Sequence, residues 1–367
     1  MTRSYVVLGG CGAMGRIAAR DLFAADRAAR IAIADLDAAR VRRDTRAYRS
    51  ARVRGFRVDA SDVPGVSKVL AGHDVVVNCT QHHFNLPVMR AALAAGCHYV
   101  DLGGLFTWTR RQLKLDRAFR RAGLVAVVGM GGSPGITNVL ARWAAEKVEY
   151  IRAIRVRSCW HDPAARPDDF YFAFSPQTVI EELTLPAYVF RGGRFKRIPP
   201  RARWERRVFP KPFGEVWCLA TRHSEVATLP DSFSGQGVRS VDFMLGYDLG
   251  FVREFERRWR AGWRLPQFKP LVAPRDKPHD QEILRVEVVG DARIVTADCI
   301  ACAKPAWRAS AGDIDTGCPP SIVARMIATG EITEPGVHPP ERCVPIAPFL
   351  RALRSRGMRT RRFEQAI

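Results

Sequence analysis

A glycine motif between a short apolar run and a helical pattern places the strongest constraint on the fold of this chain. Gly10, Gly12 and Gly15 follow the apolar run Ser4–Leu8, and Met14–Phe23 then carries apolar residues at helical spacing. The motif G-x-G-x-x-G therefore stands between a predicted strand and a predicted helix, the context that dinucleotide binding requires. The glycines permit a tight turn and a close approach to a pyrophosphate, and the first helical turn offers free N–H groups.

The acidic residue that closes the next predicted strand bears on the choice of dinucleotide. Asp35 lies 20 positions after Gly15, and a carboxylate at this spacing hydrogen-bonds the ribose hydroxyls and repels a 2′-phosphate. Arg40, Arg42 and Arg43 are close enough in sequence to favour NADP instead. We therefore expect NAD as the cofactor and keep NADP as the alternative. The residues predicted to bind the cofactor here are Gly10, Gly12, Ala13, Met14, Gly15 and Asp35.

Alternation of apolar runs with helical patterns predicts the fold class of the first third of the chain. Strands are predicted at residues 4–8, 31–34, 56–58, 74–78, 99–102 and 125–129, with helices between them. Strands that alternate with helices form parallel βαβ units. We therefore expect an α/β fold with a doubly wound parallel sheet of the Rossmann type.

The pattern changes after about residue 135. Strand-like alternation at Ile154–Arg157 and Ile283–Val289 is typical of a mixed or antiparallel sheet. Pro266–Asp280 is predicted to be a surface loop, and helices are predicted at Ser321–Ala328 and Pro348–Arg356. The predicted organisation is a Rossmann domain over 1–130, a second α+β domain over 131–305 and C-terminal helices over 306–367.

The charge balance is the most unusual feature of the composition. The chain has 58 lysines and arginines against 37 aspartates and glutamates, a formal net charge of +21. Such a field attracts nucleic acids and anionic substrates. The arginines are spread along the whole chain, however, and no nucleic-acid-binding motif accompanies them. We therefore expect a small-molecule substrate and no nucleic-acid partner.

Apolar runs and cysteines bear on the compartment. No run of about eighteen apolar residues occurs, so no membrane span is expected. The nine cysteines are scattered and odd in number, which argues against a disulfide scaffold. We therefore expect a cytoplasmic protein.

Six short segments, spread over nearly the whole chain, occur in a characteristic order. They are Gly72–Asn78, Gly96–Gly104, Ser133–Asn138, Pro212–Gly214, Met326–Ile332 and Gly336–Glu341. Their order and spacing resemble the saccharopine dehydrogenase-like family, and within it the lysine 6-dehydrogenases most closely. The resemblance implies a central domain that carries substrate contacts and the interface of a homodimer. It also implies last helices that return to pack on the Rossmann domain.

The resemblance also implies a chemistry. The family oxidises the CH–NH bond of an amino acid with hydride transfer to a nicotinamide cofactor. In saccharopine dehydrogenase this bond joins lysine to glutarate, and in lysine 6-dehydrogenase it is the bond from the ε-carbon to the amine. The expected substrates are L-lysine, then saccharopine-like conjugates, then a polyamine or another amino acid.

Further cofactor contacts are expected at the ends of the later strands. By resemblance, Asn78, Cys79 and Thr80 border the ribose and the nicotinamide. Asp59 follows the third strand, a position that often faces adenine in such folds. Ser133 precedes a Pro-Gly turn whose backbone N–H groups are suited to a carboxylate or to the carboxamide of nicotinamide.

Four titratable residues are candidates for the chemistry itself. His82 and His83 follow a strand, where a neutral imidazole could accept the substrate's proton or activate water, or could simply cap the next helix. Asp101 could hold a substrate ammonium or a backbone turn. Arg222 could bind a substrate carboxylate in bidentate fashion, which would favour a substrate with an extra carboxylate over lysine. The two adjacent histidines lack a third ligand, so no metal is expected.

A second interpretation keeps the fold and removes the chemistry. A fold does not by itself fix a function, and the substrate-side residues here depart from those of the family. The chain could therefore be a non-catalytic dinucleotide-binding or redox-sensing protein. Only the dehydrogenase would reduce the dinucleotide when an amine is supplied.

Overall fold

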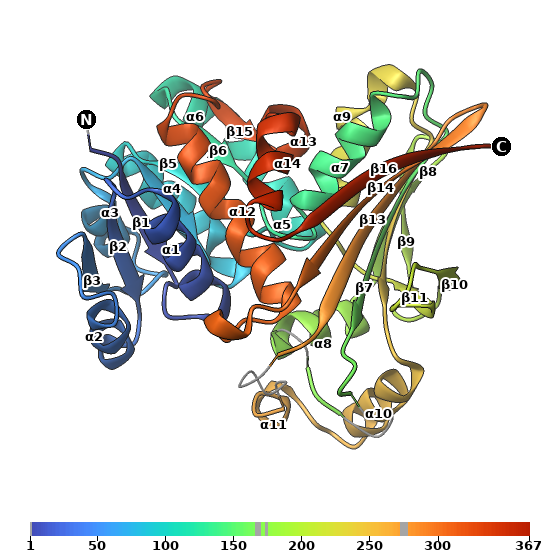
Figure 1. Ribbon diagram of the computed structural model, residues 1–367, viewed down its shortest axis with the longest axis horizontal. Coiled ribbons are helices and arrows are strands. Elements are labelled where there is room, and N and C mark those ends of the chain that lie inside the picture. Colours follow the sequence, from blue (N-terminus) through green and yellow to red (C-terminus); the bar gives the residue numbers. More distant parts are fainter. Residues whose placement is uncertain (1, 166–169, 173–174, 272–277) are drawn as a thin grey trace. The chain divides into compact units, whose positions relative to one another are not determined.

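The chain folds into two compact units, and each unit is made of two separate stretches of sequence. The computed structural model describes residues 2–165, 170–172, 175–271 and 278–367. Unit 1 comprises Met1–Val139 and Asp313–Arg356, and unit 2 comprises Leu140–Gly312 and Gly357–Ile367. Figure 1 shows the helices and strands of both units along the chain. Among the described residues, no helix combines the length and the apolar character that a membrane span requires.

The helices and strands of each unit have the following bounds. Unit 1 contains β1 (Ser4–Leu8), α1 (Ala13–Ala25), β2 (Arg30–Asp35), α2 (Ala38–Arg46), β3 (Val53–Arg57), α3 (Val63–Leu70), β4 (Val75–Asn78), η1 (His82–Phe84), α4 (Asn85–Ala95), β5 (His98–Asp101), α5 (Phe106–Gln112), η2 (Leu113–Leu115), α6 (Asp116–Ala122), β6 (Val125–Val127), β15 (Gly336–His338), α13 (Pro340–Cys343) and α14 (Ile346–Arg354). Unit 2 contains β7 (Ala153–His161), α8 (Pro176–Thr184), β8 (Ala187–Arg191), β9 (Arg194–Ile198), β10 (Trp204–Val208), β11 (Glu215–Ala220), α9 (Glu225–Ser232), η3 (Ser234–Gln236), β12 (Ser240–Gly246), α10 (Leu249–Arg260), α11 (Leu265–Phe268), β13 (Gln281–Val289), β14 (Arg293–Cys302), η4 (Pro305–Trp307) and β16 (Arg359–Ala366). Helices α7 (Ile136–Ala145) and α12 (Ala311–Ala328) span the boundaries between the units.

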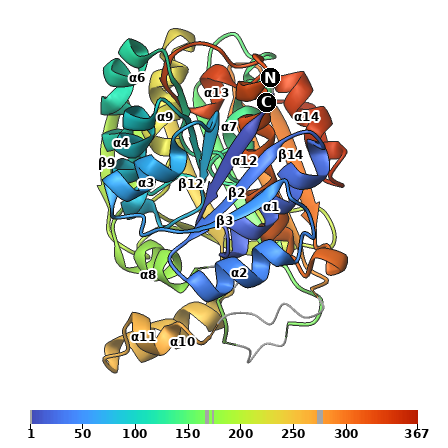
Figure 2. The same ribbon diagram turned by 90° about the vertical axis from the view of Figure 1, so that its left-hand side faces the viewer.

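Unit 1 is built on a seven-stranded parallel sheet in the order β15-β6-β5-β4-β1-β2-β3. Val6 and Leu8 of β1 face a core that includes residues of α3, α4 and α6. On the opposite face α12 lies against α1, where a Cβ added at Gly317 would come 2.7 Å from Cβ of Ile17 (Figure 2). Helices therefore cover both faces, and the prediction of a doubly wound α/β sheet is confirmed.

Unit 2 is built on a nine-stranded mixed sheet with the path β10-β11-β12-β7-β13-β14-β16 and with β8 and β9 attached beside β12. Only the β12–β7 pair is parallel, and the other pairs are antiparallel. Side chains of α8, α10 and α11 form an apolar core with Leu219 of β11. The prediction of a mixed second sheet is also confirmed.

The C-terminal part differs from the prediction of helices alone over 306–367. Helix α12 begins at Ala311, ten residues earlier than the sequence pattern indicates, and it passes through Pro319 and Pro320. Proline lacks an N–H donor and is therefore tolerated best in the first turn of a helix, whereas α12 has already begun at Ala311, and its Gly317 packs closely on Ile17 of α1. Two strands were not predicted: β15 completes the sheet of unit 1, and β16 joins that of unit 2.

One other predicted segment falls partly outside the described residues. The predicted loop Pro266–Asp280 begins inside α11, and Phe268 is fully buried, which contradicts a surface loop at that point. Residues 272–277 of this segment lie outside the described part of the chain. Phe172 packs against Phe268, with 5.5 Å between the ring centroids.

Candidate functional site

The glycine turn of unit 1 forms a cradle in front of helix α1. Gly9 has a φ of +73°, and a Cβ there would come 2.9 Å from the backbone of Cys79, so the turn packs directly on the end of β4. A Cβ at Gly15 would come 2.1 Å from the carbonyl oxygen of Gly9. Gly12 caps α1 without a side-chain hydrogen bond, and the first turn contains no acidic residue. The N–H groups of Gly9 and Gly10 donate to the carbonyl of Ala34, and that of Gly12 donates to the carbonyl of Gly9, so a pyrophosphate here would be bound by the first turn of α1.

Asp35 and Arg40 both contact this turn at Cys11. The Asp35 carboxylate accepts the N–H of Cys11 at 3.0 Å, and the Arg40 guanidinium donates to the carbonyl oxygen of Cys11. A half-buried acid at the end of β2 is placed to bind ribose hydroxyls. An arginine on the same residue of the turn can neutralise a 2′-phosphate, so the geometry supports both dinucleotides.

Asp59 lies at the exposed end of β3. Its carboxylate accepts hydrogen bonds from the backbone N–H and the hydroxyl of Ser61, at 2.8 and 2.7 Å. These bonds lower the pKa of Asp59, which keeps the carboxylate charged. Its predicted contact with adenine stays a prediction.

Asp101 is the most completely bonded of the predicted site residues. Its Oδ1 accepts the backbone N–H groups of Gly103 and Gly129, at 2.8 and 2.7 Å. Its Oδ2 accepts the hydroxyl of Tyr99 at 2.8 Å and the amide of Gln112 at 2.5 Å. Burial raises the pKa of Asp101, although these four donors oppose the shift. Of the two roles considered for Asp101, the geometry favours holding backbone turns over binding a substrate ammonium.

Asn78 and Thr80 belong to the same buried network at the end of β4. The Asn78 amide donates to Asn85 at 3.0 Å and to the Tyr99 hydroxyl at 3.1 Å. Its carbonyl oxygen accepts the Thr80 hydroxyl at 2.6 Å. Asn85 and Gln112, which close this network, were missed from the sequence because amide side chains carry no spacing pattern.

His82 and His83 form the short helix η1 before α4. His82 is buried, and its ring lies 5.8 Å from that of Trp108 and 5.9 Å from that of His83. The residue at the N-cap position of α4 is Phe84, which directly follows the two histidines. An acid–base role for His82 and His83 stays a prediction.

Ser133 precedes a turn whose N–H groups are already used within the chain. The N–H of Gly135 donates to Asn138 at 3.0 Å, and the N–H groups of Ile136 and Thr137 donate to the carbonyls of Gly131 and Gly132. These bonds contradict the expectation that the Pro-Gly turn offers free N–H groups to a ligand. They arise because Gly131 and Gly135 form a β-bridge that folds the turn onto itself. Any contact of Ser133 with the cofactor would therefore involve its side chain.

Arg222 lies in unit 2 and already contacts that unit. Its Nε donates to the carbonyl of Pro186 at 2.9 Å, and its guanidinium lies 5.3 Å from the ring centroid of Tyr188. Burial lowers the pKa of Arg222. A carboxylate clamp at this residue stays a prediction.

The next residue, His223, belongs to a buried titratable group with Glu182, Glu225 and Tyr247. Ser158 and Glu282 form a second buried pair in the same unit. We refer to these two groups together as the carboxyl cluster. His223 stacks on Phe243, with ring centroids 3.7 Å apart, and its Nδ1 lies 2.5 Å from a carboxylate oxygen of Glu225. Burial alone would lower the pKa of His223, but the Glu225 carboxylate raises it. Sequence reasoning missed Glu182 because only the tertiary fold brings it to His223.

Two carboxyl groups of the cluster have neutral hydrogen-bond donors. The Glu182 carboxylate accepts the Tyr247 hydroxyl at 2.8 Å, and the Glu282 carboxylate accepts the Ser158 hydroxyl at 2.9 Å. In the described part of the chain, neither carboxylate forms an ion pair with arginine or lysine. Desolvation raises the pKa of Glu182 and that of Glu282 to about 7. From the strand registers, Ser158 and Glu282 project from the same face of the sheet as Phe243.

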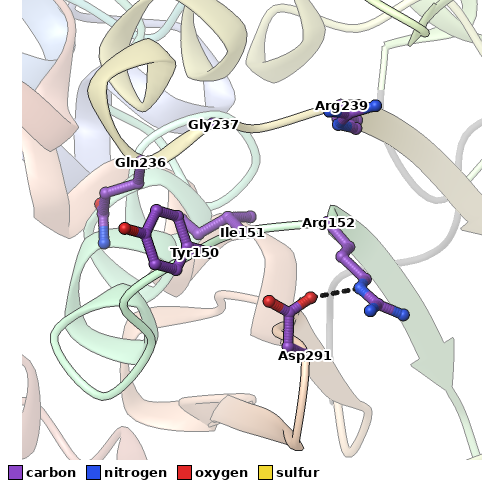
Figure 3. Close-up of a pocket in the computed structure, with 7 residues that line it drawn as sticks. All are labelled: Tyr150, Ile151, Arg152, Gln236, Gly237, Arg239 and Asp291. Carbon is purple, nitrogen blue, oxygen red and sulfur yellow. Dashed lines mark hydrogen bonds and ion pairs between the residues drawn. The ribbon is translucent and has the colours of Figure 1, made fainter.

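A separate surface pocket of unit 2 contains none of the predicted site residues. Figure 3 shows its lining by Tyr150, Ile151, Arg152, Gln236, Gly237, Arg239 and Asp291. Arg152 is paired with Asp291, and the Gln236 amide is held by the carbonyl of Val148 at 2.7 Å. Among the described residues, no group of three or more histidines, cysteines and acids could hold a metal ion.

Comparison with known proteins shows which proteins this chain is similar to. Residues 5–127 match the family model described as "Saccharopine dehydrogenase NADP binding domain". A carboxynorspermidine synthase of Vibrio cholerae is 22% identical over 54% of this chain and 50% of its own length. A carboxyaminopropylagmatine dehydrogenase of Synechocystis is 25% identical over 53% of this chain and 51% of its own length. The chain thus matches about half the length of these curated relatives.

A solved structure shares the fold of the whole chain. The saccharopine dehydrogenase (L-Glu forming) of Saccharomyces cerevisiae superposes with a TM-score of 0.76 and 16% identity, covering 99% of this chain and 100% of that one. The resemblance to the saccharopine dehydrogenase-like family is confirmed, whereas the nearness to lysine 6-dehydrogenases stays a prediction. Residues 5–127 therefore resemble the NADP-binding domain of saccharopine dehydrogenases, and the chain shares the fold of saccharopine dehydrogenase over nearly its whole length.

Proposed function

We propose that the protein is an NAD(P)-dependent oxidoreductase that acts on the C–N bond of a carboxylated amine. The observation that carries this proposal is the carboxyl cluster of unit 2, where Glu182 and Glu282 have neutral donors in a chain of net charge +21. Buried carboxyl groups of raised pKa are suited to a cationic amine, because an opposite charge restores their ionised form. The names of the two curated relatives also describe carboxylated polyamines.

His223 supplies the proton chemistry in this proposal. In the reductive direction the imidazolium donates a proton to the amine nitrogen, and in the oxidative direction the imidazole takes that proton back. Glu225 holds the ring through Nδ1 and raises the pKa of His223, which favours the imidazolium that acts as the proton donor. The bound dinucleotide supplies the partner for hydride transfer at the carbon next to that nitrogen.

The remaining residues position the two reactants. The glycine turn and Asp35 hold the dinucleotide, and the Asp101 network fixes the loops that follow β5 and β6. Arg222 is the candidate for a substrate carboxylate, and Glu182 and Glu282 are the candidates for its ammonium groups. L-Lysine and saccharopine stay alternatives to a polyamine conjugate. A homodimer is the expected assembly.

The test is a substrate panel with purified protein. Carboxynorspermidine, saccharopine, L-lysine and L-ornithine are each incubated with NAD and with NADP, and formation of the reduced nicotinamide is followed by absorbance. We expect the highest kcat/KM with the carboxylated polyamine. If the dinucleotide binds by calorimetry but no amine reduces it, the non-catalytic interpretation replaces this proposal.

A pair of variants tests the role of His223. His223→Asn should lower kcat by about 100-fold or more, the usual contribution of a general acid or base, with dinucleotide affinity unchanged. His161→Asn is the matched control, because residues 158 and 161 of β7 point to opposite faces of the sheet. Equal kcat values for the two variants would remove His223 from the mechanism.

A further inference from the structure

Strand β16 is an unusually long open edge. It has eight residues and pairs only with β14 in the described part of the chain. The other edge strands of the two sheets, β3, β9, β10 and β15, have five residues or fewer. A long open edge presents a row of unpaired N–H and C=O groups, which is a template for another strand.

The ladder with β14 shows which backbone groups point outward. The N–H of Ile367 donates to the carbonyl of Ala292 at 3.2 Å, so the backbone of this residue faces β14. Backbone direction alternates along an antiparallel strand. Phe363 and the other odd-numbered residues of β16 therefore face β14, and Arg362, Glu364 and the other even-numbered residues present their N–H and C=O groups to the open edge.

The side chains of β16 are distributed over the two faces of the sheet. Phe363 is 43% exposed although it is aromatic. Arg361 pairs with Asp298 at 2.8 Å on the same face as Phe363. On the other face Arg362 pairs with Glu146 at 3.0 Å, and Glu364 pairs with Arg293 at 2.7 Å. Opposite charges thus flank an exposed aromatic residue along the strand.

We propose that two copies of this chain pair through their β16 strands, antiparallel and with the two-fold axis at Phe363. In this register Arg362 of one copy lies opposite Glu364 of the other, and both residues present outward backbone groups. They would form a hydrogen-bonded pair with complementary charges. Phe363 would lie opposite its own counterpart in a non-hydrogen-bonded pair, where side chains approach most closely. A two-fold axis makes every such contact occur twice.

The register proposed for the two β16 strands follows from the backbone direction and the residues of β16. Antiparallel pairing about a two-fold axis perpendicular to the sheet keeps each face continuous. The two-fold axis must therefore pass between two copies of the same residue. Hydrogen bonds between the strands also require that residues whose N–H and C=O groups point to the open edge lie opposite each other. A centre at Phe363 meets both conditions and also places arginine opposite glutamate. The nine-stranded sheet would then continue across two copies.

Cross-linking tests the register directly. Phe363→Cys should form a disulfide-linked dimer on mild oxidation, because Cβ atoms of directly opposed residues lie about 4.5–5.5 Å apart. Thr360→Cys is the matched control, because its counterpart would lie six positions away along the paired strands, about 20 Å at the usual rise per residue. The unsubstituted chain controls for its nine native thiols. A cross-link at Thr360 that equals that at Phe363 would overturn the proposed register.

A second variant tests the edge itself without disturbing the fold. Glu364→Pro removes an N–H that points away from β14, so the existing ladder keeps its hydrogen bonds, as at natural edge prolines. Sedimentation should show a dimer for the native chain and at least about a tenfold higher dimer dissociation constant for Glu364→Pro, with Glu364→Ala in between. The melting temperature should be the same for both variants. A monomeric native chain, as expected if the β16 arginines only protect the edge, or a dimer unaffected by Glu364→Pro, would refute the proposal.

Discussion

At the scale of single residues, the two side chains that bond Cys11 make opposite contributions to cofactor choice. Asp35→Ala removes a charged hydrogen bond to the turn and the ribose contact. We expect a loss of about 1.5 kcal/mol, or about tenfold in NAD affinity, together with a gain in NADP affinity because the repulsion disappears. Arg40→Ala should weaken NADP and leave NAD nearly unchanged. Calorimetric titration of both dinucleotides measures this, with Asp291→Asn, an exposed acid of unit 2, as the control for a mere change of charge.

Glu182 gives unit 2 a dependence of stability on pH. Its pKa is raised by burial to about 7 in the folded chain, above its ordinary value. The contribution of Glu182 to the free energy of unfolding is therefore fully present in acid, where the carboxyl group is protonated, and it is lost as pH rises through about 7. The shift corresponds to about 3 kcal/mol. Glu182→Gln should flatten the fall of the melting temperature between about pH 5 and pH 8, relative to the native chain. Identical profiles for the two chains would show that Glu182 is ionised when folded.

At the scale of elements, two glycines of the strand–turn–helix unit β1–α1 have different roles: Gly15 is needed for stability and Gly12 for dinucleotide binding. Gly15→Ala places a Cβ against the Gly9 carbonyl, at 2.1 Å, and should destabilise the fold by about 1–3 kcal/mol or more. At Gly12 a Cβ would meet only the same oxygen, at 3.1 Å. Gly12→Ala should therefore keep the melting temperature within a few degrees and lose dinucleotide affinity, since the Cβ occupies the approach of the pyrophosphate. Thermal melts and dinucleotide titrations of both variants check this difference.

The same elements show what the sequence can predict. Local patterns located β1, α1, β4 and the acid at the end of β2, because apolar periodicity and glycine spacing act over a few residues. Strand β16 was missed because its sequence is polar and charged, and only pairing with β14 makes it a strand. The carboxyl cluster was missed for a related reason: Glu182 lies in α8 and Glu282 in β13, and only the tertiary fold sets each carboxylate beside its hydroxyl donor.

At the scale of the whole molecule, the two units are made of four stretches of sequence, and the chain passes from one unit to the other three times. Unit 1 receives α12 and β15 after unit 2 is nearly complete, and unit 2 receives β16 last of all. Neither unit is therefore made of one continuous segment, and each sheet is finished by a strand from the last part of the chain. Truncation before residue 336 should expose edges of both sheets rather than remove one domain cleanly.

The net charge of +21 gives the last test of the proposed substrate. A positive field repels a cationic polyamine conjugate and attracts saccharopine, whose carboxylates outnumber its amines. Raising the ionic strength from about 0.01 M to about 0.15 M shortens the screening length from about 30 Å to about 8 Å. If the natural substrate is a carboxylated polyamine, kcat/KM should rise a few-fold over this range, because screening removes the repulsion while the buried Glu182 and Glu282 are little affected. The same titration with saccharopine should show a fall. A fall with both substrates would indicate that the chain attracts its substrate through a carboxylate, with Arg222 rather than the carboxyl cluster as the main determinant.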